Sequence, residues 1–199
     1  IDHLRIDDTF QQITRDHGRS GAAANRVISL VGSIYKPACV RETTLRNPVE
    51  LWKAAGGRMN TKTRRKIDPP AEVLPAWRKG IEATVVNPVI RDALYWALFT
   101  GTRKGEILNL HWDNIDQQRG SFRVEAKGGD LLELPLTRQL QEILACRAQQ
   151  QIEGWVFPSP ASPDGRLTDF HHLYAAISAA GGVKFWLHAA RHCYLTVGM

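Results

Sequence analysis

Residues 93–116 read Ala-Leu-Tyr-Trp-Ala-Leu-Phe-Thr-Gly-Thr-Arg-Lys-Gly-Glu-Ile-Leu-Asn-Leu-His-Trp-Asp-Asn-Ile-Asp, and this stretch predicts two helices joined by a tight turn. The first helix starts upstream at Asn87-Pro88, because asparagine is a good N-cap and proline fits the first helical turn. Its apolar residues recur at helical spacing, and Gly101 is placed to end it. Thr102 is then placed to cap a short second helix through Ile107-Leu108.

Downstream of this stretch the apolar period changes from helical to alternating. Residues 122–126 and 132–136 alternate apolar and polar side chains, and the intervening residues 127–130, Lys-Gly-Gly-Asp, have the composition of a hairpin turn. Further helices and one short apolar strand are expected after the hairpin, at residues 137–151, 155–157 (the strand), 168–180 and from 188 onward. The sequence therefore predicts a mainly helical fold with a small antiparallel β-sheet.

The region upstream of residue 58 is also expected to be helical. A first helix is capped at residues 7–9 and stops at His17-Gly18, and a short third helix follows Asn47-Pro48 and closes at Gly56-Gly57. The second helix spans about residues 21–40, and Pro37 should kink or end it. Its expected apolar stripe recurs at three- and four-residue steps and consists of Val27, Leu30, Val31, Ile34 and Ala38.

The 199 residues carry a formal net charge of +6, and this charge is unevenly distributed. Residues 1–66 hold 13 of the 26 Lys and Arg but 6 of the 20 Asp and Glu, a net of +7, whereas residues 67–199 have a net of −1. A basic module joined to a near-neutral one favours a polyanion-binding arm attached to a domain with another task. The alternative is a solvated basic surface that keeps the protein soluble. Residues 58–70, basic and ending in a double proline, are the best candidate for a linker.

Composition excludes several classes of protein. No apolar run approaches the 18 or more residues of a transmembrane helix, and the N-terminus carries no apolar signal core. Three widely spaced cysteines form neither a disulfide framework nor a CxxC metal site, which fits a reducing cytosol. His188 and His192 have zinc-ligand spacing, so a zinc-dependent hydrolase stays open as a weaker reading, although no HExxH glutamate accompanies them.

Four motifs in one order give the chain a resemblance to the tyrosine recombinases, the family of phage integrases. The segment 93–116 resembles the family's first catalytic motif, with Thr-Gly-x-Arg-x-Gly-Glu at its centre, and 124–136 is similar to the family's hairpin with a lysine at the turn. Val156-Phe-Pro-Ser159 matches a recurring lead-in, and Leu187-His-Ala-Ala-Arg-His192 matches the His-x-x-Arg motif. Upstream, residues 24–30 and 47–49 look like the helical core-binding domain that precedes the catalytic domain.

The resemblance implies a domain organisation and an activity. A helical, SAM-like DNA-binding domain would occupy residues 1–62, a basic linker 63–70, and a DNA breaking-rejoining catalytic domain 71–199. The implied reaction is site-specific recombination or integration of double-stranded DNA at attachment-type sites, through a 3′-phosphotyrosine intermediate. The implied setting is a prophage-type enzyme in the cytoplasm that self-associates on DNA in the intact protein, with no membrane and no small-molecule substrate.

The resemblance also implies roles for single residues. Arg103 and Arg191 would clamp the non-bridging oxygens of the phosphate, because guanidinium groups stay charged and donate two parallel hydrogen bonds. His188 would donate to the same oxygens, Lys127 would protonate the leaving 5′-oxygen, and Glu106 would orient Arg103. No metal and no cofactor is expected. The implied DNA-binding residues are Arg19, Arg26, Lys36, Lys62, Arg64, Arg65 and Lys66.

Two departures from the family pattern keep an alternative open. The chain has Ala189-Ala190 where the family usually has Asp-Leu, and it stops eight residues after Arg191, before the family's nucleophilic tyrosine. Tyr194 is expected to be a buried core residue rather than a nucleophile. The prediction is therefore a fragment that lacks its own nucleophile and is inactive by itself. The alternative is a non-catalytic, sequence-tolerant DNA-binding protein derived from an integrase.

Overall fold

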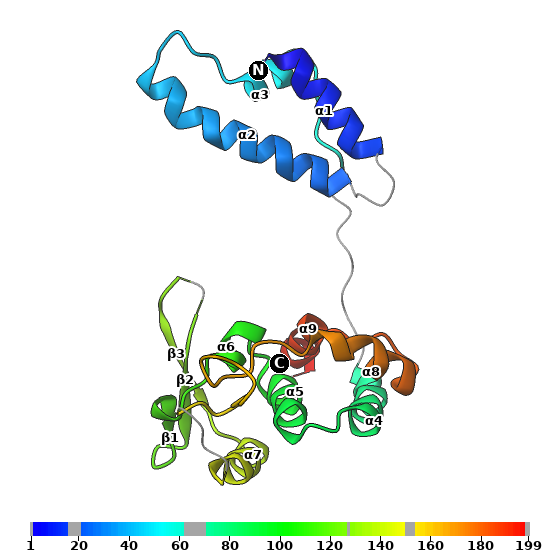
Figure 1. Cartoon of the computed structure of the whole chain (residues 1–199), viewed down its shortest axis with the longest axis vertical. Coiled ribbons are helices and arrows are strands. Elements are labelled where there is room, and N and C mark those ends of the chain that lie inside the picture. The colour runs from blue at the N-terminus through cyan, green and yellow to red at the C-terminus, as the bar shows by residue number, and fades with distance from the viewer. Residues whose placement is uncertain (1, 16–20, 62–70, 127, 150–153, 198–199) are drawn as a thin grey trace. The chain divides into compact units, whose positions relative to one another are not determined.

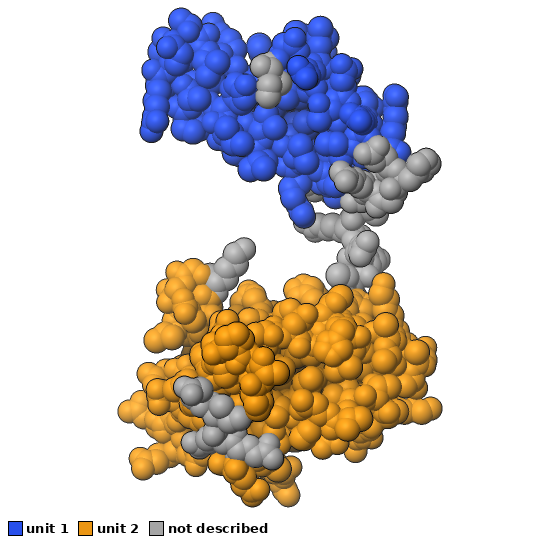
Figure 2. All heavy atoms as spheres, viewed as in Figure 1, with its two compact units in different colours: residues 1–65 blue, residues 66–199 orange. Residues whose placement is uncertain are grey.

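The computed structural model describes residues 2–15, 21–61, 71–126, 128–149 and 154–197. The contacts divide the chain into two compact units, residues 1–65 and 66–199 (Figure 2). Most of the candidate linker, together with Arg19, Lys62, Arg64, Arg65 and Lys66, lies outside the described residues. None of the described helices is both long and apolar enough to cross a membrane.

Unit 1 consists of α1 (His3–Arg15), α2 (Gly21–Arg41) and α3 (Pro48–Ala54) in its described part (Figure 1). The predicted cap of α3 is confirmed, because Asn47 accepts a hydrogen bond from the Val49 backbone N–H. The indole N–H of buried Trp52 donates to Asp7 Oδ1 at 2.8 Å, which ties α3 to α1. The small core of this unit consists of Ile6, Phe10, Ala24, Ile28, Val49 and Trp52.

The buried face of α2 differs from the predicted one. Ala24, Ile28 and Gly32 face the core, whereas Leu30 and Ile34 of the expected apolar stripe are 61% and 62% exposed. The reason is that Ile6 and Phe10 of α1, with Val49 and Trp52 of α3, pack on the face that carries Ala24 and Ile28 and leave the opposite face of α2 to solvent. Pro37 does not end the helix, which continues to Arg41.

Asn25 and Asn60 join α2 to the segment after α3. The Asn25 side chain donates to the Asn60 carbonyl and accepts from the Asn60 N–H, both at 2.8 Å. Asn60 in turn donates through its side chain to Thr14 Oγ1 and the Gly21 carbonyl. Asn25 is buried, and these bonds satisfy polar groups that would otherwise be costly to bury.

Unit 2 contains α4 (Leu74–Thr84), α5 (Pro88–Thr100), α6 (Lys104–Leu108), α7 (Arg138–Ala148), α8 (Tyr174–Gly181) and α9 (Leu187–Val197). Strands β1 (Ile115–Asp116), β2 (Ser121–Glu125) and β3 (Leu131–Pro135) form an antiparallel sheet in that order. The predicted hairpin is confirmed, with Phe122 opposite Leu134 and Val124 opposite Leu132. The predicted strand at 155–157 is wrong: Trp155 makes one isolated bridge to His111. A mainly helical fold with a small antiparallel sheet is thus confirmed.

The core of unit 2 surrounds α5. Trp96 has no exposed surface and meets the edges of Phe122 from the sheet and Phe157 from the following segment, at centroid distances of 5.0 and 5.8 Å. Trp77 of α4 packs against Phe185 at 5.4 Å and donates its indole N–H to the Lys184 carbonyl. These contacts place the chain that leads into α9 against α4.

Helices α4 and α8 cross with their backbones in direct approach. A Cβ built on Gly80 would lie 2.3 Å from the Ile177 carbonyl oxygen, and one on Gly181 would lie 2.4 Å from the Ala76 carbonyl oxygen. Because both obstructing atoms belong to backbone, no rotation of a side chain can make room for a methyl group. Only glycine fits at these two positions while the helices stay in place.

Candidate active site

The tight turn between α5 and α6 organises the site. Asn87 caps α5 by accepting from Val89 N, and Gly101 ends the helix in the left-handed conformation, with φ of 61°, as the sequence predicts. The predicted cap of α6 is wrong by one residue. Arg103, with φ of −74° and ψ of 154°, is the N-cap, and Thr102 is instead buried in the turn.

Glu106 holds Arg103 at two points. One carboxylate oxygen accepts the Arg103 backbone N–H and the other accepts guanidinium Nη1–H, each at 2.7 Å. The Glu106 side chain is only 9% exposed, whereas Arg103 is 47% exposed. A buried carboxylate with two bonds to one arginine fixes the direction of its guanidinium and leaves other N–H groups open to an anion.

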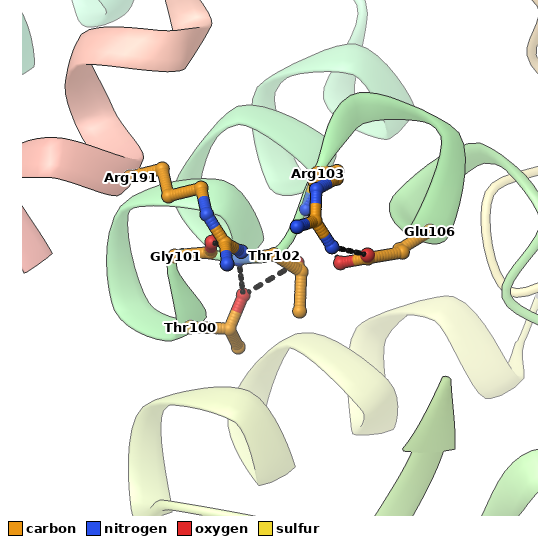
Figure 3. A network of polar contacts seen from close by, with 6 residues as sticks. All are labelled: Thr100, Gly101, Thr102, Arg103, Glu106 and Arg191. Atoms are coloured by element: carbon orange, nitrogen blue, oxygen red, sulfur yellow. Dashed lines mark hydrogen bonds and ion pairs between the residues drawn. The ribbon is translucent and has the colours of Figure 1, made fainter. Parts of the chain in front are cut away.

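Arg191 reaches the same turn from α9 (Figure 3). Its Nη1–H donates to the Gly101 carbonyl at 2.6 Å, two residues before Arg103. One turn further along α9, the Tyr194 ring packs on Gly101 so closely that a Cβ there would lie 2.6 Å from Tyr194 Cδ1. The structure therefore brings together the two arginines that the sequence analysis singled out.

Tyr194 departs from its predicted environment. The ring is 41% exposed, so the prediction of a buried core residue is wrong. Its position follows from the turn, because one ring edge covers the Cα of Gly101 and the rest projects beyond the turn. Tyr174, elsewhere in this unit, is partly buried, and burial raises its pKa to about 12, with Asp169 adding to the effect.

His188 is exposed and lies one turn before Arg191 on α9. Its Nε2 lies 3.2 Å from Nε2 of His192, so one ring donates and the other accepts. Ala189 and Ala190, between the two site residues, are buried in the core. Within the described residues no group of three or more His, Cys, Asp and Glu gathers around this pair.

A cavity of about 570 Å³ lies between α6 and the hairpin. Arg103 and Glu106 line it from α6, and Ala126 lines it from the hairpin. Lys127 itself lies outside the described residues. The hairpin closes through the hydrogen bond from Ala126 N–H to the Asp130 carbonyl, and Gly128 and Gly129 both have positive φ. The described hairpin residues nearest Lys127 thus share a cavity with Arg103.

Arg123 is a basic residue of the site that the sequence analysis missed. It lines the same cavity from β2, and its Nη2 donates to the Asp113 carbonyl at 3.4 Å. The signal that could have found it is the alternation of β2, which turns Phe122 and Val124 to the core and Arg123 to the opposite face.

Two further candidate residues belong to unit 1. Arg26 and Lys36 are exposed on α2 in unit 1, ten residues apart. A larger cavity, about 710 Å³, is lined by residues of α4, α5 and α7 such as Tyr95, Phe99 and Ile143. None of the described candidate site residues lines this larger cavity, so cavity size alone does not identify the candidate active site.

Comparison with known proteins gives consistent results. The sequence profile of the phage integrase family matches residues 83–197. The prophage integrase IntF of Escherichia coli (strain K12) is 33% identical over 93 residues, which are 44% of this chain and a fifth of IntF. The chain therefore spans a small part of this curated relative.

Solved structures show the same fold. A lambda integrase tetramer bound to a Holliday junction superposes with a TM-score of 0.73 at 20% identity, over 97% of this chain and 58% of that one. The Tn1549 transposon integrase in complex with circular intermediate DNA gives 0.68 at 16% identity, over 100% and 75%. With the family profile matching more than half of its residues, the chain belongs to the phage integrase family.

Proposed function

We propose that this chain is the DNA-binding and phosphate-activating part of a tyrosine-type site-specific recombinase. The reaction joins and breaks DNA strands through a 3′-phosphotyrosine. The observation that supports the proposal is the turn at residues 100–103. Arg103 belongs to this turn, and Arg191, 88 positions later in the sequence, hydrogen-bonds to the carbonyl of Gly101, two residues before Arg103.

The chemistry of these groups suits a phosphodiester in a five-coordinate transition state. Arg103, oriented by Glu106, and Arg191, anchored on the Gly101 carbonyl, present fixed positive charge to the non-bridging oxygens. His188 projects from the same helix as Arg191 and donates to the same oxygens. Lys127, on the hairpin, protonates the leaving 5′-oxygen. Four donors on one phosphate perform the chemistry without a metal or a cofactor.

The proposed partner is double-stranded DNA with attachment-type sites, and the intact protein self-associates on it in the cytoplasm. DNA binding and self-association are supported by the similar solved structures, which include a lambda integrase tetramer bound to a Holliday junction and a transposon integrase in complex with DNA. Arg26 and Lys36 on α2, with Arg19 and the basic residues of the linker, supply the phosphate contacts of unit 1.

A salt titration of DNA binding tests this part of the proposal. Because bound Lys and Arg release counterions from DNA, affinity should fall by orders of magnitude between about 50 and 200 mM salt. Replacing both Arg26 and Lys36 by alanine should lower the slope of log affinity against log salt by about 2, whereas Arg138→Ala, at a highly exposed arginine of α7, should not change it. Binding that ignores salt would contradict the proposal.

The nucleophile is proposed to lie outside the four tyrosines of this chain. Incubation with a suicide substrate, nicked close to the cleavage site, should therefore give no denaturant-resistant complex with the chain alone. Tyr194 is the critical case, because its ring is partly exposed and lies on Gly101 beside Arg191. An adduct mapped to Tyr194 would overturn this assignment.

The separate roles of Lys127 and the arginines can be tested in the intact protein that contains this chain. Lys127→Ala should slow cleavage of ordinary DNA roughly 10²–10⁴-fold, and a substrate with sulfur as the leaving 5′-atom should restore much of the rate, because a thiolate leaves without a proton. Arg103→Ala and Arg191→Ala should stay equally slow on both substrates. Rescue of all three variants alike would remove Lys127 as the acid.

Ala189-Ala190 is one of the two departures from the family pattern that support the non-catalytic alternative. Both residues are buried, so no side chain at these positions reaches a bound phosphate, and the departure removes no reacting group. The cleavage assay on the arginine variants also tests this alternative. If the intact protein does not cleave DNA, or if its cleavage does not depend on Arg103 and Arg191, the alternative is favoured.

A further inference from the structure

Two threonine hydroxyls lie inside the turn that carries the arginines (Figure 3). Thr100 Oγ1 lies 2.7 Å from the Trp96 carbonyl oxygen and 2.7 Å from Thr102 Oγ1, and it accepts the Thr102 backbone N–H at 3.2 Å. Thr102 is only 4% exposed. A partly buried hydroxyl pair with this many contacts is an ordered network.

The number of hydroxyl protons available determines which threonine donates in the hydrogen bond between them. Thr100 has one hydroxyl proton, and the Trp96 carbonyl can only accept, so that proton goes to Trp96. The proton between the two hydroxyls must then come from Thr102. Thr102 therefore donates to Thr100 through its side chain and through its backbone N–H, and both bonds close around Gly101.

We propose that Thr100 and Thr102 are positioning residues for Arg191, acting through the orientation of the Gly101 carbonyl. That carbonyl is the acceptor of Arg191 Nη1–H at 2.6 Å, and the peptide that carries it lies between the two threonines. Thr102 also precedes Arg103 directly, so the same network fixes where α6 begins.

The inference deepens the proposed function, since it rests on a phosphate shared by the two arginines. An arginine clamp stabilises a transition state only if its donors are already aimed when charge develops. Glu106 aims Arg103 from one side, and the threonine pair aims Arg191 from the other. The turn therefore sets the separation of the two guanidinium groups.

Arginine side-chain NMR on the full ¹⁵N-labelled chain tests this without any reaction. In the wild type, the bond to Gly101 should slow rotation of the Arg191 guanidinium and protect its Nη protons. Thr102→Val removes the donor at nearly constant volume and should abolish this signature. It should also weaken binding of inorganic phosphate, followed by Arg Nε shifts, about tenfold, because Thr100 Oγ1 loses one of its two donors and keeps only the longer bond from the Thr102 backbone N–H, which loosens the turn. Thr102→Ser should restore both readouts.

Thr84→Val is the matched control. Thr84 is the last residue of α4, as Thr100 is of α5, and its hydroxyl donates to the Gly80 carbonyl at 2.7 Å with no arginine involved. It should lower the midpoint of thermal unfolding by a similar amount and leave the Arg191 signals and phosphate affinity unchanged. If Thr102→Val does not fold, Thr102→Ala removes the same donor without an added methyl group.

Two outcomes separate the inference from the function beneath it. An unchanged Arg191 signature in folded Thr102→Val or Thr102→Ala overturns the positioning role and leaves the proposed function intact. Failure of wild-type protein to bind phosphate contradicts the phosphate clamp, while the Arg191 signature still reports whether the threonines position the side chain.

Discussion

Replacing Gly101 by alanine should be among the most damaging single-methyl changes in this protein. Gly101 has φ of 61°, where an L-residue costs about 1–2 kcal/mol. In addition, the new Cβ would lie 2.6 Å from Tyr194 Cδ1, about 1 Å inside an ordinary carbon–carbon contact. Overpacking of this kind costs about 1–3 kcal/mol, so the total loss of unfolding free energy should be about 2–5 kcal/mol.

The two contributions can be measured separately. Gly120 has φ of 65° with nothing within 4 Å of its would-be Cβ, so Gly120→Ala reports the backbone cost alone, about 1–2 kcal/mol. Tyr194→Ala removes the ring atoms nearest the turn and leaves its own Cβ at 3.1 Å, a distance that a shift of a few tenths of an ångström relieves. In that background Gly101→Ala should cost no more than Gly120→Ala.

Urea unfolding followed by tryptophan fluorescence is the assay, because five of the six tryptophans belong to residues 66–199. The expected coupling energy between Gly101→Ala and Tyr194→Ala is about 1–3 kcal/mol. The reasoning fails if Gly101→Ala and Gly120→Ala destabilise equally, or if the excess persists without the Tyr194 ring. Either result would mean that the Tyr194 ring does not pack closely on Gly101.

Other consequences of the structure can be checked with the same assay. Gly80→Ala should cost at least about 3 kcal/mol, because its methyl meets a backbone carbonyl, whereas Gly105→Ala, in an open helical position, should be neutral or stabilise by up to about 1 kcal/mol. Arg147→Met should cost about 3–5 kcal/mol at neutral pH, since it removes the partner 2.8 Å from the largely buried Asp92 carboxylate. Burial raises the Asp92 pKa above its ordinary value, so Asp92 takes up its proton at a higher pH in the folded than in the unfolded chain, and the loss in Arg147→Met should shrink as the pH falls and the unpaired carboxylate becomes neutral.

Local signals predicted much of unit 2 correctly. The asparagine caps, the left-handed Gly101 and the β2–β3 hairpin are determined by residues close in sequence, and each is where the pattern predicted. Glu106 was expected to orient Arg103, and the two are three residues apart, so one turn of helix is enough to bring them together. That Arg103 and Arg191 bind the same phosphate stays a prediction.

Properties that depend on packing partners were harder to predict. Leu30 and Ile34 are large and apolar, yet α2 buries Ala24, Ile28 and Gly32, because α1 and α3 pack on that other face of the helix. Hydrophobic periodicity identifies a candidate face of a helix, but it does not tell which face the neighbouring helices will cover. Tyr194 shows the same limit: its spacing indicated a core aromatic, whereas its position depends on the backbone of a turn more than 90 residues away.

The crossing of α4 and α8 affects how precisely α9 is positioned against the turn at residues 100–103. Side-chain packing between helices usually tolerates small translations, since rotamers adjust. At this crossing, Gly80 lies against the Ile177 carbonyl and Gly181 against the Ala76 carbonyl, so sliding α8 until Ala180 took the place of Gly181 would drive a Cβ into the Ala76 peptide group. The crossing therefore resists movement of α8 along α4 in that direction. Leu187, six residues after Gly181, begins α9, so this close backbone contact helps to set the position of the helix that carries His188 and Arg191, and a single methyl group at Gly80 or Gly181 would displace both.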